Sequence, residues 1–162
     1  MKPAHSLAIV VAVMAGILAA SARPARAEIG VGVFLGQPTG LDVKIDLQRR
    51  AALDIVVGWD DFDDGRDGYA HLTYLVGLGV ARGRSVLIPF RLGVGGVVYG
   101  GAGDFGDEVN VGVRAPFEMG IRFRRTPLEI YGEIAIKLTL LDDNDNDDQV
   151  DADGGIGLRV YF

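Results

Sequence analysis

The residues best suited to nucleophilic chemistry in this sequence are His71 and Thr73, with Ser85 the only serine after residue 27. In a β-strand, positions two apart lie on the same face, so the His71 imidazole would stand beside the Thr73 hydroxyl. A hydroxyl next to a general base can act as a nucleophile. The alternative, which such pairs more often represent, is that both side chains fill the interior of the fold.

Oxygen-rich side chains form a second candidate site in the segment Asp142–Asp148. Counted from Asp143, the EF-hand pattern requires glycine at the sixth position and glutamate at the twelfth, where this sequence has Asp148 and Gly154. We therefore expect Asp142 to Asp151 to be a solvated, self-repelling acidic loop that associates only loosely with divalent cations. Two Gly-x-Gly spacings resemble part of a nucleotide loop, but no helix follows them, so we predict no cofactor.

Charge and cysteine content exclude several classes of protein. All 22 acidic residues but only 13 of the 16 basic ones lie after Ala27, which gives that part of the chain a formal charge of −9. Nucleic acid is not an expected partner, because phosphate binding needs a basic surface. The absence of cysteine excludes disulfides, thiolate metal sites and a lipid-modified N-terminal cysteine.

The first 27 residues have the pattern of a cleaved secretory signal. Lys2 supplies the positive charge, Leu7–Ala20 is an uninterrupted run of apolar and small residues, and Ala25-Arg26-Ala27 matches a small-x-small cleavage site. The apolar run has 14 residues, fewer than a membrane-spanning helix requires. We therefore predict a signal peptide at 1–27 and a single exported domain at 28–162.

Strict alternation of apolar and polar residues recurs through the exported domain and predicts β-strands. No segment has a helical apolar stripe, so we predict an all-β fold. Pro89 and Pro116 each remove a hydrogen-bond donor from a predicted strand, and we expect both to face the interior at bulges. The eight predicted strands are Ile29–Gly36, Leu41–Gln48, Ala52–Trp59, Ala70–Val80, Val86–Tyr99, Val109–Phe123, Leu128–Leu140 and Gly155–Phe162.

The two faces of these strands differ in a way that favours a membrane barrel. The apolar face has no charge, whereas the mixed face is rich in glycine and carries balanced charges. A crowded, narrow lumen suits the mixed face better than a solvated surface does, which leaves the apolar face for lipid. The charged members of the mixed face are Asp42, Asp46, Asp54, Glu118, Glu129 and Glu133, with Lys44, Arg91, Arg114, Arg122, Lys137 and Arg159, and its glycines include Gly30, Gly32, Gly77, Gly79, Gly93, Gly95, Gly155 and Gly157.

The connectors between strands alternate in kind after the first turn. Long acidic connectors span 60–68, 100–108 and 142–151, while short arginine-bearing ones lie at 49–50, 81–84 and 124–127. In an up-and-down meander, alternate connectors emerge at opposite ends. Since outer-membrane barrels have short periplasmic turns and longer extracellular loops, we expect the acidic loops to face the exterior and the arginine-bearing turns the periplasm.

The signal pattern, the eight alternating segments and the C-terminal Arg159-Val160-Tyr161-Phe162 resemble the small eight-stranded outer-membrane barrels of the OmpA transmembrane-domain and OmpX type. The resemblance implies an eight-stranded antiparallel up-and-down transmembrane β-barrel in the bacterial outer membrane. It also implies that Phe162 is part of the signal read by the barrel-assembly machinery. Such barrels serve as anchors, adhesins and enzymes, so the resemblance does not identify a surface partner.

Counting residues around the predicted turns groups four charges in the lumen. Pairing across Phe123 and Leu128 places Glu118 opposite Glu133. Counting through the neighbouring loops brings Arg91 close to Glu118 and Arg159 close to Glu133. We therefore predict a charge cluster in the order Arg91, Glu118, Glu133, Arg159 that plugs the lumen, because eight strands leave room only for side chains.

These observations favour a small non-enzymatic barrel with a structural or surface-interaction role and outer-membrane lipid as its surroundings. One alternative is an outer-membrane lipid-modifying hydrolase built around His71, since eight-stranded lipid A deacylases use a His-x-Ser pair that His71-Leu72-Thr73 approaches. The other alternative is a soluble periplasmic barrel that binds an apolar ligand.

Overall fold

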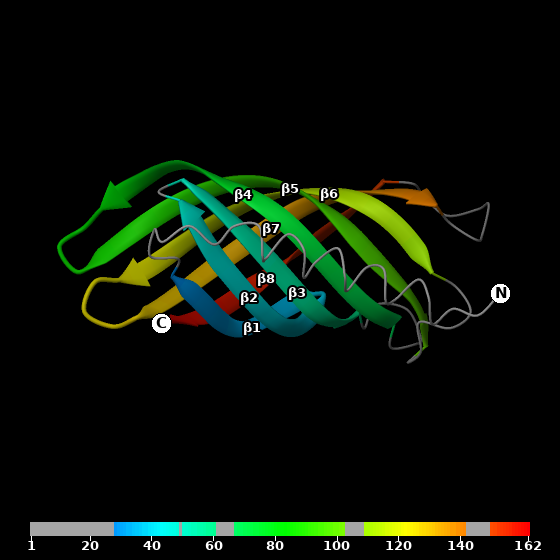
Figure 1. The fold of residues 1–162 in the computed structure, drawn as a ribbon, viewed down its shortest axis with the longest axis horizontal. Helices are drawn as coiled ribbons and strands as arrows, with labels where there is room; N and C mark the ends of the chain where they lie inside the picture. Colours follow the sequence, from blue (N-terminus) through cyan, green and yellow to red (C-terminus); the bar gives the residue numbers. More distant parts are fainter. Residues whose placement is uncertain (1–27, 49, 61–66, 103–108, 142–149) are drawn as a thin grey trace.

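The computed structural model describes residues 28–48, 50–60, 67–102, 109–141 and 150–162. These residues form a closed barrel of eight antiparallel strands in sequence order, which confirms the predicted all-β, up-and-down architecture (Figure 1). Within the described ranges, no helix is long and apolar enough to cross a membrane. The strands are β1 (Ile29–Gln37), β2 (Thr39–Gln48), β3 (Ala51–Asp60), β4 (Asp67–Arg82), β5 (Val86–Ala102), β6 (Asn110–Phe123), β7 (Leu128–Leu141) and β8 (Val150–Tyr161).

Side chains alternate between the lumen and the outer surface as the sequence pattern predicts. In β6, burial alternates from Gly112 to Gly120, with Arg114 and Glu118 buried and Phe117 and Met119 exposed. Because successive residues of a strand point to opposite faces, the charged set lies inside and the apolar set covers the outside.

A β-bulge in β4 corrects one part of this assignment. The predicted alternation from Ala70 to Val80 placed both Gly77 and Gly79 in the lumen. In the structure Gly77 pairs with Arg91 and Gly79 pairs with Phe90, so the register shifts between them. Gly79 therefore shares the register of Phe90, on the face opposite to that of Arg91. An extra residue in one strand of an antiparallel pair reverses the facing of every residue after it.

The two strand prolines face the lumen, and Pro89 and Pro116 are both buried. The expected bulges between β5 and β6 are absent, because the pairs on either side of each proline keep one register. The pairing instead lapses locally, between Leu87 and Phe90 and again between Leu92 and Gly95. The missing N–H groups are therefore accommodated by gaps in the ladder.

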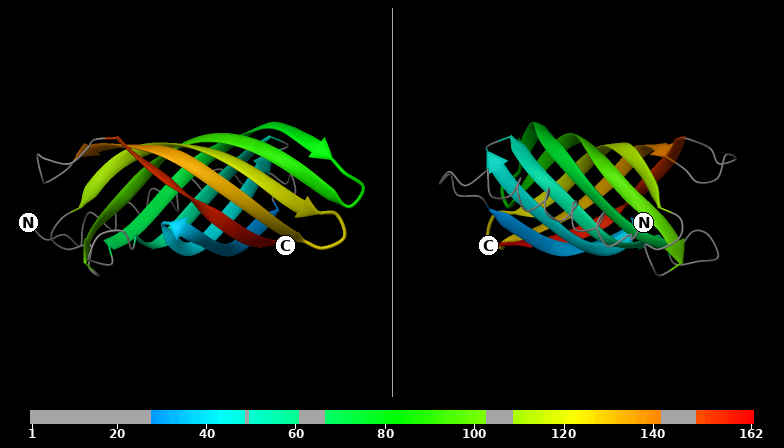
Figure 2. Two further views of the ribbon diagram at one scale, coloured as in Figure 1. Left: turned by 180° about the vertical axis from the view of Figure 1, so that it is seen from behind. Right: turned by 45° about the vertical axis from the view of Figure 1, so that its right-hand side comes forward.

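The barrel has a tall side and a short side. β4 and β5 have 16 and 17 residues, whereas β1 has 9. Ala51 is paired with Val76, and no described residue of β3 pairs with β4 beyond that point. The β4–β5 hairpin consequently projects past the β2–β3 turn at the end that holds the C-terminus (Figure 1 and Figure 2, left). We call this the basic end, because Arg50, Arg82, Arg124 and Arg125 lie there.

Candidate functional site: the charged lumen

The lumen holds buried charged side chains from six of the eight strands and the buried imidazole of His71 from a seventh. Each occupies an inward-facing position of its strand. The pairing between strands therefore determines its position along the barrel axis. Buried charges are normally paired, because an isolated charge in a low-dielectric interior is costly. The buried members are Asp42, Lys44, Asp54, Arg91, Arg114, Glu118, Glu129, Glu133, Lys137, Asp153 and Arg159, with His71 from β4 completing the seven strands.

Arg159 is the centre of this network and is fully buried. Its guanidinium donates to Asp42 Oδ2 at 2.5 Å through Nε and to Glu118 Oε2 at 2.7 Å through Nη1. A third bond, from Nη2, reaches Asp54 Oδ1 at 2.5 Å. The guanidinium also stacks 3.6 Å over the centre of the Tyr131 ring. One cation thus joins three carboxylates from β2, β3 and β6, which is the forked geometry that guanidinium offers and ammonium does not.

A second arginine extends the network toward the basic end. Arg91 donates to Glu118 and, at 2.7 Å, to Glu129 Oε1. Glu129 also accepts a hydrogen bond from the Tyr161 hydroxyl, which lies 3.3 Å from Lys44 Nζ. Lys44 completes this group by bonding Asp46 Oδ1 at 2.7 Å, so each charge has an opposite charge beside it.

Arg114 extends the network in the other direction. It donates to Glu133 Oε1 at 2.6 Å and to Thr73 Oγ1 at 3.3 Å, and its Nη1 lies 3.0 Å from His71 Nε2. Arginine can only donate, so this last contact requires His71 Nε2 to act as the acceptor. Farther along, Lys137 lies 3.3 Å from Asp153 Oδ1, and Asp153 accepts from the buried Tyr69 hydroxyl.

Aromatic rings fill the spaces that the lumen glycines leave. The Tyr131 ring lies over Gly157, where an added Cβ would come within 2.1 Å of ring carbons. Phe34 lies over Gly155 in the same way and stacks on Tyr131 with 5.9 Å between ring centres. Gly155 and Gly157 are therefore required by the rings that pack against them.

Ion pairs join three of the four residues predicted to cluster, because Glu118 contacts both Arg91 and Arg159, and the fourth, Glu133, lies opposite Glu118 in the β6–β7 ladder. Glu118 pairs with Glu133 across β6 and β7, as counting around the turn predicts, and Arg91 pairs with Glu118 across β5 and β6. Arg159 pairs with Glu129 in the β7–β8 ladder, four positions away from Glu133. Glu133 accepts from Arg114 instead.

The predicted position of Arg159 differs because the count through the last connector placed Leu141 opposite Ala152, whereas in the structure Ala152 pairs with Ile136. Asp42, Asp54 and Arg114 were recognised as lumen charges but not as members of the cluster. The alternation of apolar and polar residues predicts that all three side chains face the lumen. Asp42 and Asp54 contact Arg159 from strands that do not pair with β8, which counting along hairpins does not provide. The Arg114–Glu133 contact is a diagonal one within the β6–β7 hairpin.

His71 and Thr73 lie side by side in the β4 alternation, but their surroundings do not favour nucleophilic chemistry. Both are buried in the lumen, and Arg114 contacts both the imidazole and the hydroxyl oxygen. An Nε2 that accepts from arginine is not available to take the Thr73 proton, and Nδ1 has no hydrogen-bond partner in the described part of the chain. Ser85 is in the exposed turn at the basic end, away from this site.

The candidate cation site at Asp142 to Asp151 falls largely outside the described residues, which omit 142–149. Asp151 itself lies 3.1 Å from Lys137 Nζ. Among the residues the structure describes, no group of three or more histidine, aspartate or glutamate side chains is arranged to hold a metal ion.

Comparison with known proteins supports the fold. No protein-family model matches the chain, and no curated protein sequence matches it. Among solved structures, the chain is similar to the N-terminal β-barrel domain of Pseudomonas aeruginosa OprF, with a TM-score of 0.53 and 12% sequence identity. The match covers 84% of this chain and 96% of that domain. The resemblance to small eight-stranded barrels is therefore confirmed at the level of the fold.

Proposed function

We propose that this protein is a small bacterial outer-membrane barrel with a non-enzymatic structural or surface-interaction role. The observation that carries the proposal is its inverted polarity. Large apolar side chains on the outer surface are strongly exposed, including Ile134 at 68%, Ile156 at 63% and Val94 at 63%, while Arg159 and Glu118 are fully buried. A soluble barrel would place the charges outside, so lipid is the solvent that fits this surface.

The dimensions of the strands agree with this proposal. A tilted membrane-spanning strand needs about 9 to 11 residues. The shortest strand here has 9 residues, and β6 and β7 have 14 each. A closed barrel also pairs its backbone groups between neighbouring strands, which a lipid environment demands.

Export and assembly follow from the sequence pattern. The pattern at 1–27 supports a cleaved signal peptide and hence a periplasmic route. Phe162 is 82% exposed at the end of β8, which leaves its ring accessible to the barrel-assembly machinery that we propose as its partner. We further propose that the basic end faces the periplasm and that the acidic connectors, most of whose residues lie outside the described ranges, face the cell exterior.

The alternatives have less support. A soluble periplasmic barrel would expose to water the apolar belt that includes Ile134 and Ile156. A hydrolase built on His71 would need a nucleophile that lipid can reach, whereas His71 and Thr73 are 3% and 0% exposed and both contact Arg114.

Trp59, the single tryptophan, gives a direct test of the membrane assignment because it lies on the outer surface of β3 and is 47% exposed. Protein folded into vesicles that contain brominated lipid should show strong quenching of Trp59 fluorescence. Cell fractionation should recover the protein in the outer membrane, with different mobility in heated and unheated gel samples. Recovery in the soluble periplasmic fraction, with Trp59 insensitive to brominated lipid, would reject the proposal.

A further inference from the structure

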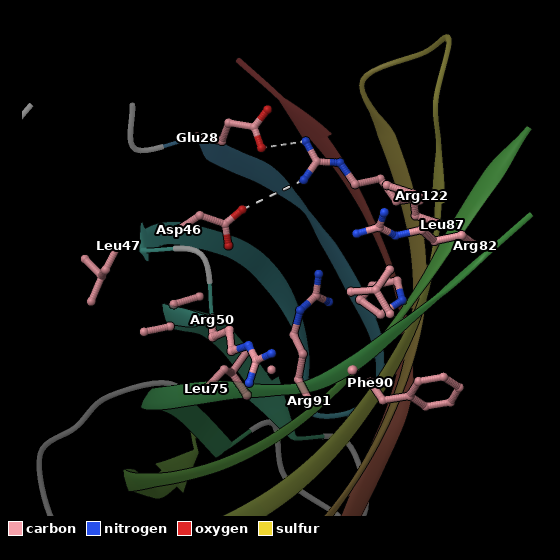
Figure 3. Close-up of a pocket in the computed structure, with 16 residues that line it drawn as sticks. Glu28, Asp46, Leu47, Arg50, Leu75, Arg82, Leu87, Phe90, Arg91 and Arg122 are labelled. Carbon is pink, nitrogen blue, oxygen red and sulfur yellow. Dashed lines mark hydrogen bonds and ion pairs between the residues drawn. The ribbon is translucent and has the colours of Figure 1, made fainter. Parts of the chain in front are cut away.

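The basic end of the barrel opens into a pocket of about 620 Å³ (Figure 3). Its floor includes Leu75 and Arg91, and one wall is the projecting β4–β5 hairpin with Val80, Arg82 and Leu87. The wall is low on the side of the β2–β3 turn, where Arg50 lies.

Four guanidinium groups face this pocket. Figure 3 shows the side chains of Arg50, Arg82, Arg91 and Arg122 turned toward the same space from four different parts of the chain. Arg91 is neutralised from below by Glu118 and Glu129. The other three arginines are not held by that buried network.

The two carboxylates in the pocket lining are already engaged. Glu28 Oε2 lies 2.7 Å from Arg122 Nη2, and Asp46 Oδ2 lies 3.9 Å from Arg122 Nη1. Asp46 also pairs with Lys44 through Oδ1. Among the residues the structure describes, no carboxylate lies within ion-pair distance of Arg50 or Arg82. The pocket therefore presents two arginines, from different sides, for which the described part of the chain supplies no counter-ion.

We propose that this pocket binds a phosphate-bearing anion between Arg50 and Arg82. Guanidinium matches the oxygen geometry of phosphate and forms charge-assisted hydrogen bonds to it. The apolar lining of Leu75, Val80 and Leu87 lowers the local dielectric and strengthens such bonds relative to those on an open surface. The site lies at the mouth of the barrel above the buried network, whose Arg91 forms part of the pocket floor, and it is the same whichever compartment the basic end faces.

Two sources of phosphate fit this chemistry. One is a soluble phosphate or phosphorylated small molecule that enters through the mouth. The other is a phospholipid headgroup that reaches the pocket over its low side, where Leu47 contributes to the lining. Both use the same two arginines, so the experiment needs one arm for each source.

The first arm titrates inorganic pyrophosphate into the folded full-length barrel in a neutral maltoside detergent, followed by calorimetry. The wild type should bind saturably with one site. Arg50→Gln combined with Arg82→Gln should weaken binding by about tenfold or more, since each charge-assisted bond is worth roughly that factor. The matched control is Arg124→Gln combined with Arg125→Gln, which removes the same charge from an exposed turn that does not line the pocket.

A third variant, Val80→Trp, fills the pocket while keeping every arginine. Loss of pyrophosphate binding in this variant supports a pocket, whereas wild-type affinity would show that the arginines act only as surface charge and would overturn the proposal. Equal weakening in the Arg124/Arg125 control would overturn it in the same way. Heat-dependent gel mobility verifies that each variant is folded before titration.

The second arm transfers the protein from vesicles of phosphatidylcholine and phosphatidylglycerol into maltoside and counts retained lipids by native mass spectrometry. Phosphatidylglycerol retained by the wild type and by the Arg124/Arg125 control, but not by the Arg50/Arg82 variant, identifies the headgroup as the ligand. Saturable pyrophosphate binding without retained lipid identifies a soluble phosphate. The absence of both signals in the wild type would overturn the proposal.

Discussion

Replacement of Arg159 by methionine should be the most destabilising single change in the lumen. Methionine approximates the length of the arginine side chain but removes its charge and its donors. The change leaves Asp42, Asp54 and Glu118 without the cation that joins them. Their remaining partners are unequal, since Glu118 keeps Arg91 and Asp42 keeps the Tyr131 hydroxyl at 2.6 Å.

The expected loss of stability depends on which carboxylate is left without a cation. Asp54 is 1% exposed, and the other basic group within ion-pair distance of it, His71 Nε2 at 3.6 Å, accepts from Arg114 and therefore carries no proton to offer Asp54. Removing one partner of a buried ion pair costs about 3 to 5 kcal/mol. Glu118→Gln should cost only about 1.5 to 3 kcal/mol, the range for one bond to a charged group, because Arg91 keeps Glu129 and Arg159 keeps two aspartates.

The matched test adds Asp54→Asn to Arg159→Met, which removes the stranded charge. We expect the double variant to recover about 1 to 3 kcal/mol relative to the sum of the single changes, the range for directly coupled residues. Denaturant unfolding in lipid vesicles, followed by Trp59 fluorescence and by gel mobility, measures the free energies. Equal costs for Arg159→Met and Glu118→Gln, or strict additivity of the double variant, would refute the assignment of Arg159 as the centre of the network.

Four further predictions test the outer surface, the lumen and the orientation. Ile134→Arg should destabilise the barrel by about 2 to 4 kcal/mol in vesicles if this residue lies near the bilayer midplane, and an unchanged stability would show that its outer face does not meet lipid. Gly157→Val should prevent Tyr131 from keeping its position and should lower stability, whereas unchanged unfolding would contradict the packing over this glycine. In planar bilayers the wild type should show no sustained large conductance, and a stable porin-sized channel would contradict a plugged lumen. Trypsin added to intact cells should cut after Arg66 or nowhere, and efficient cutting after Arg124 would reverse the proposed orientation.

The fold was predictable because the period-two pattern is nearly unbroken and one face carries no charge. The same pattern predicted the facing of β6 and β7 and the pairing of Glu118 with Glu133, since a four-residue turn fixes the register of its hairpin. It failed at Leu78, where nothing in the local sequence distinguishes a bulge from continued alternation. It also misplaced Arg159, because the register of β8 depends on where the strand resumes after a long connector.

The charged network was predictable as a composition but not as a set of contacts. The alternation of apolar and polar residues along their strands assigns Asp42 and Asp54 to the lumen. Neither residue is close to Arg159 in the sequence, and neither lies in a strand that pairs with the strand of Arg159. Arg159 reaches both because an eight-stranded barrel is narrow enough for one long side chain to cross its interior. The pocket at the basic end was not predictable from the pattern, since it results from the unequal heights of β3 and β4.

The arrangement of charges on the β6–β7 hairpin indicates why these contacts must cross the lumen. In this hairpin Arg114 pairs with Lys137 and Glu118 pairs with Glu133, so like charges stand directly opposite each other. Like charges at facing positions destabilise an isolated antiparallel pair. In the closed barrel the repulsion is relieved diagonally, where Arg114 reaches Glu133, and from neighbouring and distant strands, where Arg91 and Arg159 reach Glu118.

Glu118 and Lys137 of this hairpin therefore gain their opposite charges only after β5 and β8 are in place on either side of it. A soluble protein can build a hydrophobic core hairpin by hairpin, but the ion pairs of this interior are complete only when the sheet closes. Each ion pair across the lumen consequently favours the closed barrel over partly assembled sheets. The same pairs that we expect to block the lumen to solutes are thus the interactions that make closure cooperative.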